Sequence, residues 1–387
     1  MKVLVVHNVY QHRGGEDSVM EAEVALLSSR GHSVELFLRH NDAVDQMSHA
    51  NAAVQTFWAT QTGREFEALL RSFKPDVVHV HNTFPLISPA IYWVADRLGV
   101  PVVQTLHNFR LLCPQANFLR EGKICEDCLG KLPWRGAVRG CYRDSKLQST
   151  VLAGMVTLHR AIGTWQNKVT RYIAFNEFCR SKFIAGGLPA SRIVIKPNFV
   201  DFEAPADLAR AGLLFVGRLS TEKGVGVLAG AAALLADAQL CIVGDGPKAA
   251  FLDGVKGIKR LGQLSASAVK HEMNRAAAVV VPSICYETFC MVVLEAFASG
   301  SPVIASRIEV LPNLVIDGVT GLLFEPGNSQ DLANKMLWAQ QHPEQMADMG
   351  RNARALYEAQ YTAERNYQQL MTIYQDAISE VKGKAVL

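Results

Sequence analysis

Two carboxylates flank an apolar run near residue 290. Glu287 and Glu295 lie in the stretch YETFCMVVLEAFASGSPVIAS, residues 286–306, with seven residues between them. The apolar spacing predicts a helix that starts near Thr288, which would separate the two carboxylates by roughly 80° and about 12 Å. Because they could not share a proton at that distance, a general acid/base pair is disfavoured. Two interpretations stay open: solvated surface charges, and anchors for the two ends of a long polar ligand.

The loop FVGRLSTEKG, residues 215–224, carries cations that suit a diphosphate. Gly217 allows close backbone approach, Arg218 offers a two-pronged phosphate contact and Lys223 supplies a point charge. Such a loop after a strand is common, so it is specific only in combination with the two glutamates. The start of the predicted helix is a further anion site, formed by the backbone amides of Phe289, Cys290 and Met291.

Four cysteines fall within 29 residues, with the spacing C-x11-C-x2-C-x12-C. No disulfide framework is expected in a cytosolic protein, and four thiolates that include a C-x2-C pair are typical of a tetrahedral zinc site. Reduced or redox-active thiols are the alternative, since the spacing is wider than in common zinc ribbons. The predicted ligands of a structural zinc are Cys113, Cys125, Cys128 and Cys141.

Short β-branched runs alternate with helical patterns along most of the chain, which predicts an α/β fold with parallel sheets. A polar stretch around residues 198–211 separates two such series, so we expect two doubly wound domains, residues 1–197 and 198–362. A ligand is expected in the cleft between them, at the carboxyl ends of the strands. The helical segment 363–387 has no strand after it and is expected to pack back on the first domain. The predicted strands are residues 2–9, 32–38, 76–82, 101–108, 171–178, 192–198, 213–219, 239–246, 257–264, 277–283, 301–306 and 320–327.

The composition indicates a globular protein without a membrane span. Hydrophobic residues make up 49% and charged residues 19% of the chain, and no apolar run reaches the roughly 18 residues of a transmembrane helix. The start, MKVLVVHNVYQHRGG, fits a first strand better than a signal peptide. The expected location is therefore the cytoplasm.

Positive charge gathers between residues 131 and 182, where ten basic residues meet two acidic ones. A solvated helical face is one interpretation, and a surface for anionic lipid headgroups on the cytosolic face of the membrane is another. Nucleic acid binding is disfavoured because no nucleic-acid motif accompanies the charge. Aromatic residues are interleaved with the cations: Trp134, Tyr142, Trp165 and Tyr172.

These motifs together resemble the retaining glycosyltransferases of family 4, also called glycosyl transferases group 1. The resemblance rests on the Glu-x7-Glu element followed by GSPVIAS, on FVGRLSTEKG and VGDGP, on the GG at residues 14–15 and on the HN at residues 107–108. It spans essentially the whole chain and implies the GT-B fold, in which two Rossmann-like domains face a cleft. One position departs from the family, which usually has glycine where Cys290 stands, and a side chain there would narrow the sugar pocket.

The resemblance implies a role for each matching residue. Glu295 would hold the ribose hydroxyls of a nucleotide sugar, and Glu287 would hydrogen-bond hydroxyls of the donor hexose. Arg218 and Lys223 would neutralise the diphosphate leaving group. His107 would lie over the anomeric centre near the acceptor, although a satisfied core histidine is the alternative there. The donor-binding set implied is Gly14, Gly15, Gly217, Arg218, Lys223, Phe289, Cys290, Met291 and Glu295, and the catalytic set is His107, Arg218, Lys223 and Glu287.

The activity implied is transfer of a hexose, with retention, from a UDP- or GDP-sugar to a glycan or lipid-diphosphate acceptor, in polysaccharide or glycoconjugate biosynthesis. No Asp-x-Asp occurs in the chain, so we expect metal-independent catalysis with no cofactor beyond the structural zinc. A nucleotide-sugar 2-epimerase of the same architecture is the alternative. An NAD-dependent oxidoreductase is disfavoured because G-x-G-x-x-G does not follow the first strand. A non-catalytic sugar-binding module would not need both cations of the 215–224 loop.

Overall fold

The computed structural model describes residues 1–202 and 209–384, and the described residues form two compact units. The N-terminal unit comprises Met1–Asn117, Glu126–Asn198 and Glu364–Leu387, and the C-terminal unit comprises Phe118–Cys125 and Phe199–Ala363. The division falls close to the predicted boundary between residues 197 and 198. The middle of the predicted junction and the last three residues of the predicted C-terminal helix lie outside the described residues.

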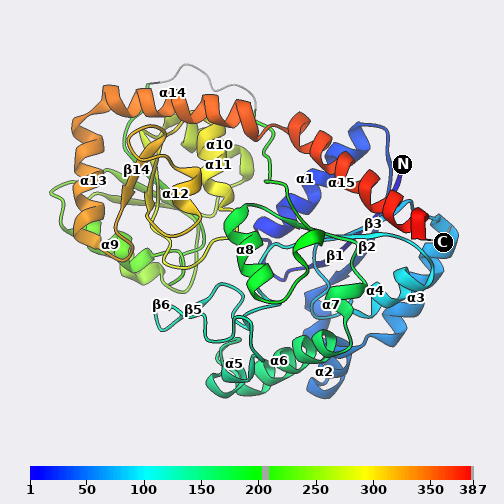
Figure 1. The fold of residues 1–387 in the computed structure, drawn as a ribbon. Coiled ribbons are helices and arrows are strands. Elements are labelled where there is room, and N and C mark those ends of the chain that lie inside the picture. The colour runs from blue at the N-terminus through cyan, green and yellow to red at the C-terminus, as the bar shows by residue number, and fades with distance from the viewer. Residues whose placement is uncertain (203–208, 385–387) are drawn as a thin grey trace. The chain divides into compact units, whose positions relative to one another are not determined.

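A parallel sheet runs through the N-terminal unit with the strand order β2–β1–β3–β4–β7–β8 (Figure 1). Its inner strands are short runs rich in β-branched residues and buried on both faces, as is typical of parallel sheets. Val3 of β1 pairs with Val34 on one side and with Val77 on the other. The strands are β1 (Lys2–Val9), β2 (Ser33–His40), β3 (Val77–Val80), β4 (Val102–Thr105), β7 (Arg171–Ala174) and β8 (Ile193–Ile195).

Capped helices connect these strands. Ser145 and Asn176 each accept a hydrogen bond from the backbone amide three residues later and so cap α6 and α8. The helices of this unit are α1 (Gly15–Ser29), α2 (His49–Phe57), α3 (Thr60–Phe73), α4 (Ala90–Arg97), α5 (Trp134–Arg139), α6 (Lys146–Ala161), α7 (Thr164–Asn167), α8 (Glu177–Ala185), α15 (Ala363–Lys384) and the 3₁₀ turns η1 (Asn41–Gln46) and η2 (Ala190–Arg192). Across residues 1–202 and 209–384, no helix has the length and apolarity needed to cross a membrane.

The C-terminal unit repeats the architecture with a second parallel sheet, in the order β11–β10–β9–β12–β13–β14. Its strands are β9 (Leu213–Val216), β10 (Leu240–Val243), β11 (Ile258–Gly262), β12 (Ala278–Val281), β13 (Val303–Ser306) and β14 (Gly321–Phe324), with a separate antiparallel pair β5 (Leu119–Arg120) and β6 (Lys123–Ile124). Its helices are α9 (Val225–Ala233), η3 (Ala249–Leu252), α10 (Ala266–Arg275), α11 (Met291–Ala298), α12 (Leu311–Leu314), α13 (Ser329–Gln341) and α14 (Pro343–Gln360).

The predicted strands are confirmed, as is the α/β class with two parallel sheets, but most strands end earlier than predicted. The strand predicted over 213–219 ends at Val216, and the strand predicted over 239–246 ends at Val243. Gly217 and Gly244 follow these ends with positive φ angles of 156° and 126°. The motif residues therefore lie in loops at the carboxyl edge of the sheet.

The helix predicted to start near Thr288 is wrong at its beginning. Cys290 has a left-handed backbone, with φ 62° and ψ 75°, and α11 begins at Met291. Glu287 therefore lies in the loop before the helix, and the separation calculated along one helix does not apply. The left-handed conformation also explains why glycine suits position 290, because it costs a residue with a Cβ atom roughly 1–2 kcal/mol.

The C-terminal helix α15 packs onto the N-terminal unit beside α1 (Figure 1). Leu370 and Tyr374 of α15 belong to the same buried core as Val3 of β1. The Tyr374 hydroxyl also lies 2.7 Å from His79 Nδ1. The end of the chain thus completes the core of the unit in which the chain begins.

A fully buried ion pair links three elements of this unit. Lys196, directly after β8, donates from Nζ to Glu23 Oε1 of α1 at 2.6 Å and to Asn366 Oδ1 of α15 at 3.1 Å. Lys196 is 0% and Glu23 1% exposed. Removing one partner of such a pair leaves a buried charge uncompensated, whereas losing an exposed pair costs little.

We therefore expect Lys196→Met to lower the free energy of unfolding by roughly 3–5 kcal/mol, because the Glu23 carboxylate would lose its counter-charge. Denaturant unfolding followed by circular dichroism measures this. Arg30→Met is the matched control, since Arg30 of α1 pairs with Glu364 of α15 but its side chain is 41% exposed. That control should cost about 0.2–1 kcal/mol. Equal losses in the two variants would contradict this role for Lys196.

Candidate functional site

The loops that follow β9 and β10 pack backbone to backbone. The Gly217 amide donates to the Val243 carbonyl at 3.0 Å. A Cβ atom on Gly244 would lie 2.0 Å from the Gly217 carbonyl oxygen, so glycine is required for this approach. The packing fixes the loop that carries Arg218, whose side chain is exposed at the carboxyl edge of the sheet.

Lys223 and Glu287, which were predicted from separate motifs, form an ion pair. Lys223 Nζ lies 2.6 Å from Glu287 Oε1, and the Ser283 hydroxyl donates to the same oxygen at 2.8 Å. Burial alone would raise the pKa of Glu287, but the ammonium and the hydroxyl hold that pKa below its usual value. Burial would likewise lower the pKa of Lys223, and the Glu287 carboxylate raises it instead. Both groups are therefore ionised at neutral pH.

Close backbone packing brings the two motifs together. Gly224 ends the 215–224 loop with φ +71°, and a Cβ atom there would lie 1.8 Å from the Pro282 carbonyl oxygen. The Ile284 amide donates to the Glu222 carbonyl at 3.0 Å. The loop after β9 is therefore held against the segment after β12, which explains how residues 64 positions apart in the chain meet.

The second turn of α11 presents Glu295. Its side chain is only partly exposed, and burial raises its pKa to about 7. Phe289 and Cys290 are buried, and Met291 is the first residue of the helix. A partly desolvated carboxylate forms strong hydrogen bonds to hydroxyl groups once it is ionised.

Gly14 and Gly15 open α1 in the N-terminal unit. Gly14 is the N-cap residue, and its amide donates to Asp17 Oδ2 at 2.8 Å. Asp17 Oδ1 in turn lies 2.8 Å from His7 Nε2 of β1, so this carboxylate ties the helix start to the strand. The Gly14 amide is thus engaged within the unit, while Gly15 is exposed as the first residue of the helix.

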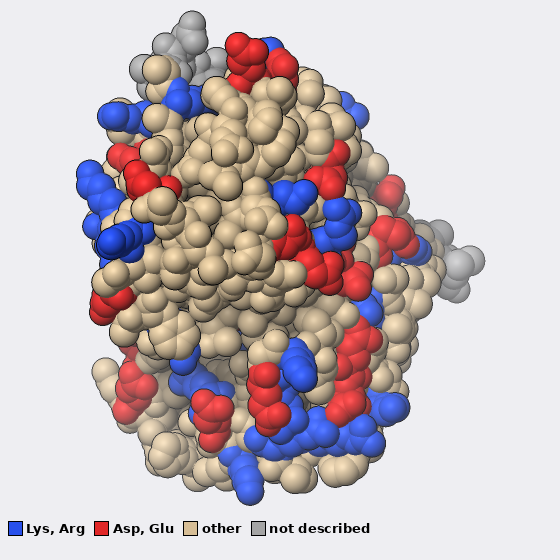
Figure 2. All heavy atoms as spheres, turned by 90° about the vertical axis from the view of Figure 1, so that its left-hand side faces the viewer, with Lys and Arg blue, Asp and Glu red and all other residues tan. Residues whose placement is uncertain are grey.

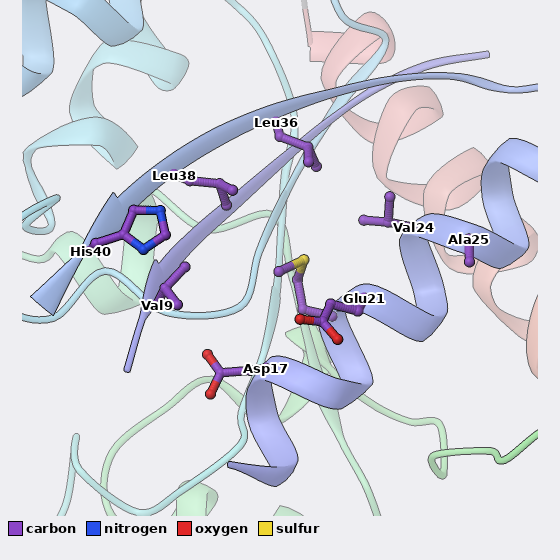
Figure 3. Close-up of a pocket in the computed structure, with 9 residues that line it drawn as sticks. Val9, Asp17, Glu21, Val24, Ala25, Leu36, Leu38 and His40 are labelled. Carbon is purple, nitrogen blue, oxygen red and sulfur yellow. The ribbon is translucent and has the colours of Figure 1, made fainter. Parts of the chain in front are cut away.

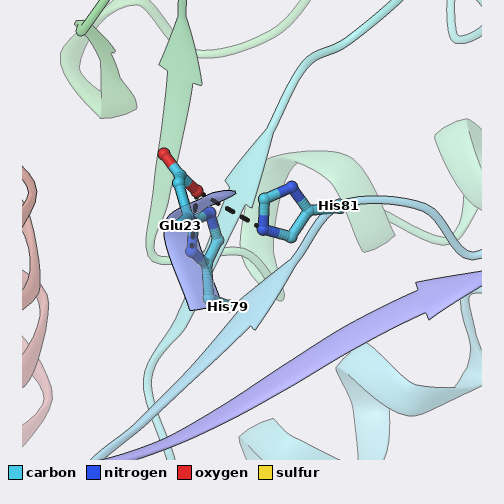
Figure 4. A group of neighbouring side chains, drawn as sticks. All are labelled: Glu23, His79 and His81. Atoms are coloured by element: carbon cyan, nitrogen blue, oxygen red, sulfur yellow. Dashed lines mark ion pairs between the residues drawn. The ribbon is translucent and has the colours of Figure 1, made fainter. Parts of the chain in front are cut away.

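His107 belongs to a chain of histidines at the carboxyl ends of β3 and β4. Its Nε2 atom lies 2.9 Å from His81 Nδ1, and His81 Nε2 lies 3.5 Å from Glu23 Oε2 (Figure 4). Burial lowers the pKa of His81 and of His107 well below the usual value, so both rings are neutral near pH 7. A proton on either His81 Nδ1 or His107 Nε2 makes the hydrogen bond that joins the two neutral rings.

Metal-binding atoms approach within 4.8 Å of one another in one group of the described chain: Glu23, His79 and His81. The Lys196 ammonium already neutralises the Glu23 carboxylate. Both ring nitrogens of His79 are occupied, one by the Tyr374 hydroxyl at 2.7 Å and the other by the Thr105 hydroxyl at 2.8 Å. We therefore interpret this group as an ion-pair and hydrogen-bond network that orients His81.

All four predicted zinc ligands lie outside helices and strands, Cys128 and Cys141 in turns and Cys113 and Cys125 in irregular segments. The Cys141 amide donates to the Gly136 carbonyl at 3.0 Å. A Cβ atom on Gly136 would lie 2.7 Å from the Pro114 ring, so the segment that carries Cys113 contacts the helix that precedes Cys141. Zinc binding stays a prediction.

A cavity of about 350 Å³ lies between α1 and the edge strand β2 (Figure 3). Val24, Leu36 and Leu38 form much of its wall, and Glu21 and His40 also line it. Among the described residues that line it there is no Lys or Arg, so this cavity does not suit a diphosphate. Its lining contains no residue of the 215–224 loop or of the 286–306 stretch.

Asp17, Glu23 and His81 were not predicted as site residues. The two carboxylates look like ordinary surface charges in the sequence after the first predicted strand, because their burial depends on partners elsewhere in the chain. His81 gave a weak signal, since residues 79 and 81 of VVHVHN alternate and so face the same side of a strand.

Comparisons with known proteins agree with this geometry. The family model "Glycosyl transferase 4-like domain" matches residues 14–198, and the model "Glycosyl transferases group 1" matches residues 201–356. The chain is 26% identical over 275 residues to sulfoquinovosyl transferase SQD2 of Arabidopsis thaliana, covering 68% of this chain and 49% of that protein. It is 40% identical over 261 residues to a GDP-mannose-dependent alpha-mannosyltransferase of Corynebacterium glutamicum, covering 67% and 57%.

The chain thus spans about half the length of the first of these relatives and little more of the second. Among solved structures, HepE of Anabaena in complex with UDP and glucose is 19% identical, with a TM-score of 0.68 over 96% of this chain and 98% of that one. That likeness concerns the fold. The two family models, the motifs and the two parallel-sheet units together show that the chain belongs to the GT-B glycosyltransferases of family 4, the glycosyl transferases group 1.

Proposed function

We propose that this glycosyltransferase moves a hexose, with retention, from a UDP- or GDP-sugar to a glycan or lipid-linked acceptor in polysaccharide or glycoconjugate biosynthesis. The observation that carries the proposal is the meeting of two donor-binding motifs, where Lys223 Nζ lies 2.6 Å from Glu287 Oε1. Two known proteins support the donor class: HepE was solved with UDP and glucose, and the mannosyltransferase relative is named for GDP-mannose.

In this proposal the C-terminal unit binds the donor. Glu295 accepts hydrogen bonds from the ribose hydroxyls, and Arg218 binds the diphosphate through its guanidinium. Glu287 contacts hydroxyls of the hexose and also holds the Lys223 ammonium, which neutralises the leaving group. Two cations and the backbone amides at the start of α11 stabilise the negative charge that develops on the leaving diphosphate, so the proposed catalysis needs no metal.

By the family resemblance, His107 is proposed to contact the reacting end of the donor. The hydrogen bond between His107 Nε2 and His81 Nδ1 supports this role, because it holds the His107 ring in one orientation. The acceptor hydroxyl attacks from the face that the diphosphate leaves, and the leaving phosphate takes the proton. His107 is thus a polar contact at the anomeric centre and not the base.

We also propose a structural zinc at the four cysteines. The segment that carries Cys113 contacts α5 through Pro114 and Gly136, and Cys141 is bonded to the same helix. A Cβ atom on Gly130, two residues after Cys128, would lie 3.0 Å from a carbonyl oxygen of α8. A bound metal would hold these segments, which otherwise have little secondary structure of their own.

Peripheral association with anionic membrane is proposed for the N-terminal unit. Large apolar side chains around α5 are exposed by 55% to 64%: Leu132, Trp134, Val138 and Leu147. Several nearby cations already have partners, as with Lys182 and Glu126 at 2.5 Å. The charge left for lipid is therefore smaller than the composition suggests. On the face shown in Figure 2, which is the left-hand side of Figure 1, basic and acidic side chains are interspersed.

For the donor site, we expect Arg218→Ala and Lys223→Ala each to lower turnover by roughly 10²–10³-fold, because each removes a preorganised contact to the leaving group. The assay incubates the pure chain with a panel of nucleotide sugars, with and without lipid-diphosphate acceptors, and measures nucleoside diphosphate release. Arg260→Ala is the control, since Arg260 lies on β11 of the same sheet and pairs with Asp253 at 2.9 Å. Nucleoside diphosphate release that requires added Mg²⁺, or the absence of release from every donor in the panel, would contradict the proposal.

For the cysteines, we expect about one zinc per chain after a chelator wash, because four thiolates bind zinc tightly. Elemental analysis measures the metal. Cys128→Ser should lose it, whereas Cys241→Ser, in β10 and outside the cluster, should keep it. A folded, active preparation without zinc would rule the site out.

For the membrane surface, we expect the chain to co-sediment with anionic vesicles at low salt and to detach as salt rises, since each cation near the surface contributes roughly 1 kcal/mol. Val138→Glu should weaken this binding. The control is Val319→Glu, at a 44% exposed position of the C-terminal unit. The idea fails if neutral vesicles bind the chain equally well.

A further inference from the structure

A second cavity, also of about 350 Å³, lies in the N-terminal unit and contains two guanidinium groups. Its walls come from η1, α2, α6 and the loops that follow β3 and β4. Arg110 lies two residues after the HN motif, and Arg143 lies in the turn before α6. None of the residues that the family resemblance placed in the donor site lines this cavity.

Arg110 lies against two aromatic rings, Phe84 and Tyr142, which contact each other edge to face. Its guanidinium carbon lies 4.7 Å from the centroid of Phe84 and 5.3 Å from that of Tyr142. Its Nη1 atom is buried and has no hydrogen-bond partner within the described chain. Arg160 shows the contrast, because its guanidinium donates to the carbonyls of Lys131 and Leu111. Arg110 is therefore stacked in place with an unused donor that an incoming acceptor group could engage.

The carboxyl groups near Arg110 do not cancel its charge. Asp45 also lines the cavity and accepts a hydrogen bond from Gln11 at 2.8 Å. Glu16 accepts a hydrogen bond from the Tyr10 hydroxyl at 2.9 Å, and burial raises its pKa to about 7, so it is only partly ionised at neutral pH. With Arg143 also in the lining, the cavity carries a net positive charge.

The opposite wall of the cavity is apolar. Val44 and Met47 come from η1 and the turn after it, and Leu147 and Val151 from α6. The Leu147 side chain is 64% exposed, so the apolar wall continues onto the surface of the unit. A ligand that fits would have one anionic group and an apolar body attached to it.

We propose that this cavity binds the phosphate group of the acceptor through Arg110 and Arg143, with an apolar portion of the acceptor along Leu147 and Val151. Planar guanidinium groups match phosphate oxygens in pairs, and aromatic stacking holds Arg110 ready for this contact. The acceptor role rests on the proposed function, because it assumes transfer to an amphiphilic phosphate. Binding of such a phosphate does not depend on that assumption.

Isothermal titration of the full chain with n-octyl phosphate tests the site directly. We expect saturable binding, weakened roughly tenfold to a hundredfold in Arg110→Met, which keeps an apolar side chain against the rings but loses the charged hydrogen bonds. Arg110→Lys should recover only part of the affinity, because a point charge replaces the fork. Arg97→Met is the matched control, since Arg97 is an exposed cation of the same unit that pairs with Glu67, and it should bind like the parent.

Two further ligands separate the contribution of the phosphate group to binding from that of the apolar chain. The neutral n-octyl β-D-glucoside should bind much more weakly than n-octyl phosphate, and so should inorganic phosphate, which lacks the apolar body. Equal affinity for n-octyl glucoside, or unchanged n-octyl phosphate affinity in an Arg110→Met variant with parent-like thermal unfolding, would overturn the proposal. Equal affinity for inorganic phosphate would overturn the assignment of the apolar wall.

Nucleoside diphosphate binding, measured on the same variants, distinguishes this site from the donor site. Arg110→Met should keep the parent affinity for UDP and GDP while it loses n-octyl phosphate. If the chain releases no nucleoside diphosphate from any donor but still binds n-octyl phosphate through Arg110, the proposed function fails and the phosphate site stands. A parallel loss of both ligands in Arg110→Met would contradict a separate site.

Discussion

The ion pair between Lys223 and Glu287 is the interaction on which the proposed donor site depends. It joins the loop after β9 to the segment after β12, and both loops are held by backbone contacts that exclude a Cβ atom at Gly224 and Gly244. The ion pair also gives the two cations of this loop, Arg218 and Lys223, different surroundings. Arg218 is exposed, whereas the Lys223 ammonium is held by the Glu287 carboxylate. In the proposed site, a diphosphate would therefore meet one exposed guanidinium and one ammonium that is already paired.

The N-terminal unit has its own central constraint, the buried charge of Glu23. Lys196 neutralises one carboxylate oxygen, and the other faces His81, which contacts His107. Burial lowers the pKa of His81 and of His107, so both rings are neutral beside this carboxylate and its charge is neutralised by Lys196 alone among these three groups. Helix α15 contributes to the same network through Asn366, so the last helix of the chain supports a residue proposed to lie at the reaction centre.

Much of the fold could be predicted from the sequence, because buried parallel strands are continuous β-branched runs that end at glycine-containing loops. The predicted start of α11 failed for a specific reason. A cysteine in a left-handed conformation interrupts the helix, and nothing local in TFCMVV signals it. The pairing of Lys223 with Glu287, the burial of Glu23 and the stacking of Arg110 were equally hidden, since each depends on partners tens of residues away. The spacing of the motifs predicted the candidate site residues, but it could not predict that Lys223 and Glu287 form an ion pair.

Each of the two units contains its own proposed site for phosphate groups. We propose that the C-terminal unit binds a diphosphate through Arg218, Lys223 and the start of α11, and that the cavity at Arg110, which has an apolar wall, binds a second phosphate group. Amide hydrogen exchange in the presence of UDP or GDP tests most directly whether the two motifs of the C-terminal unit bind the nucleotide. We expect protection of residues 217–224 and 287–295, with little change at residues 108–112 and 141–151. Protection confined to the N-terminal unit, or no protection of either donor segment by both nucleotides at saturating concentration, would contradict it.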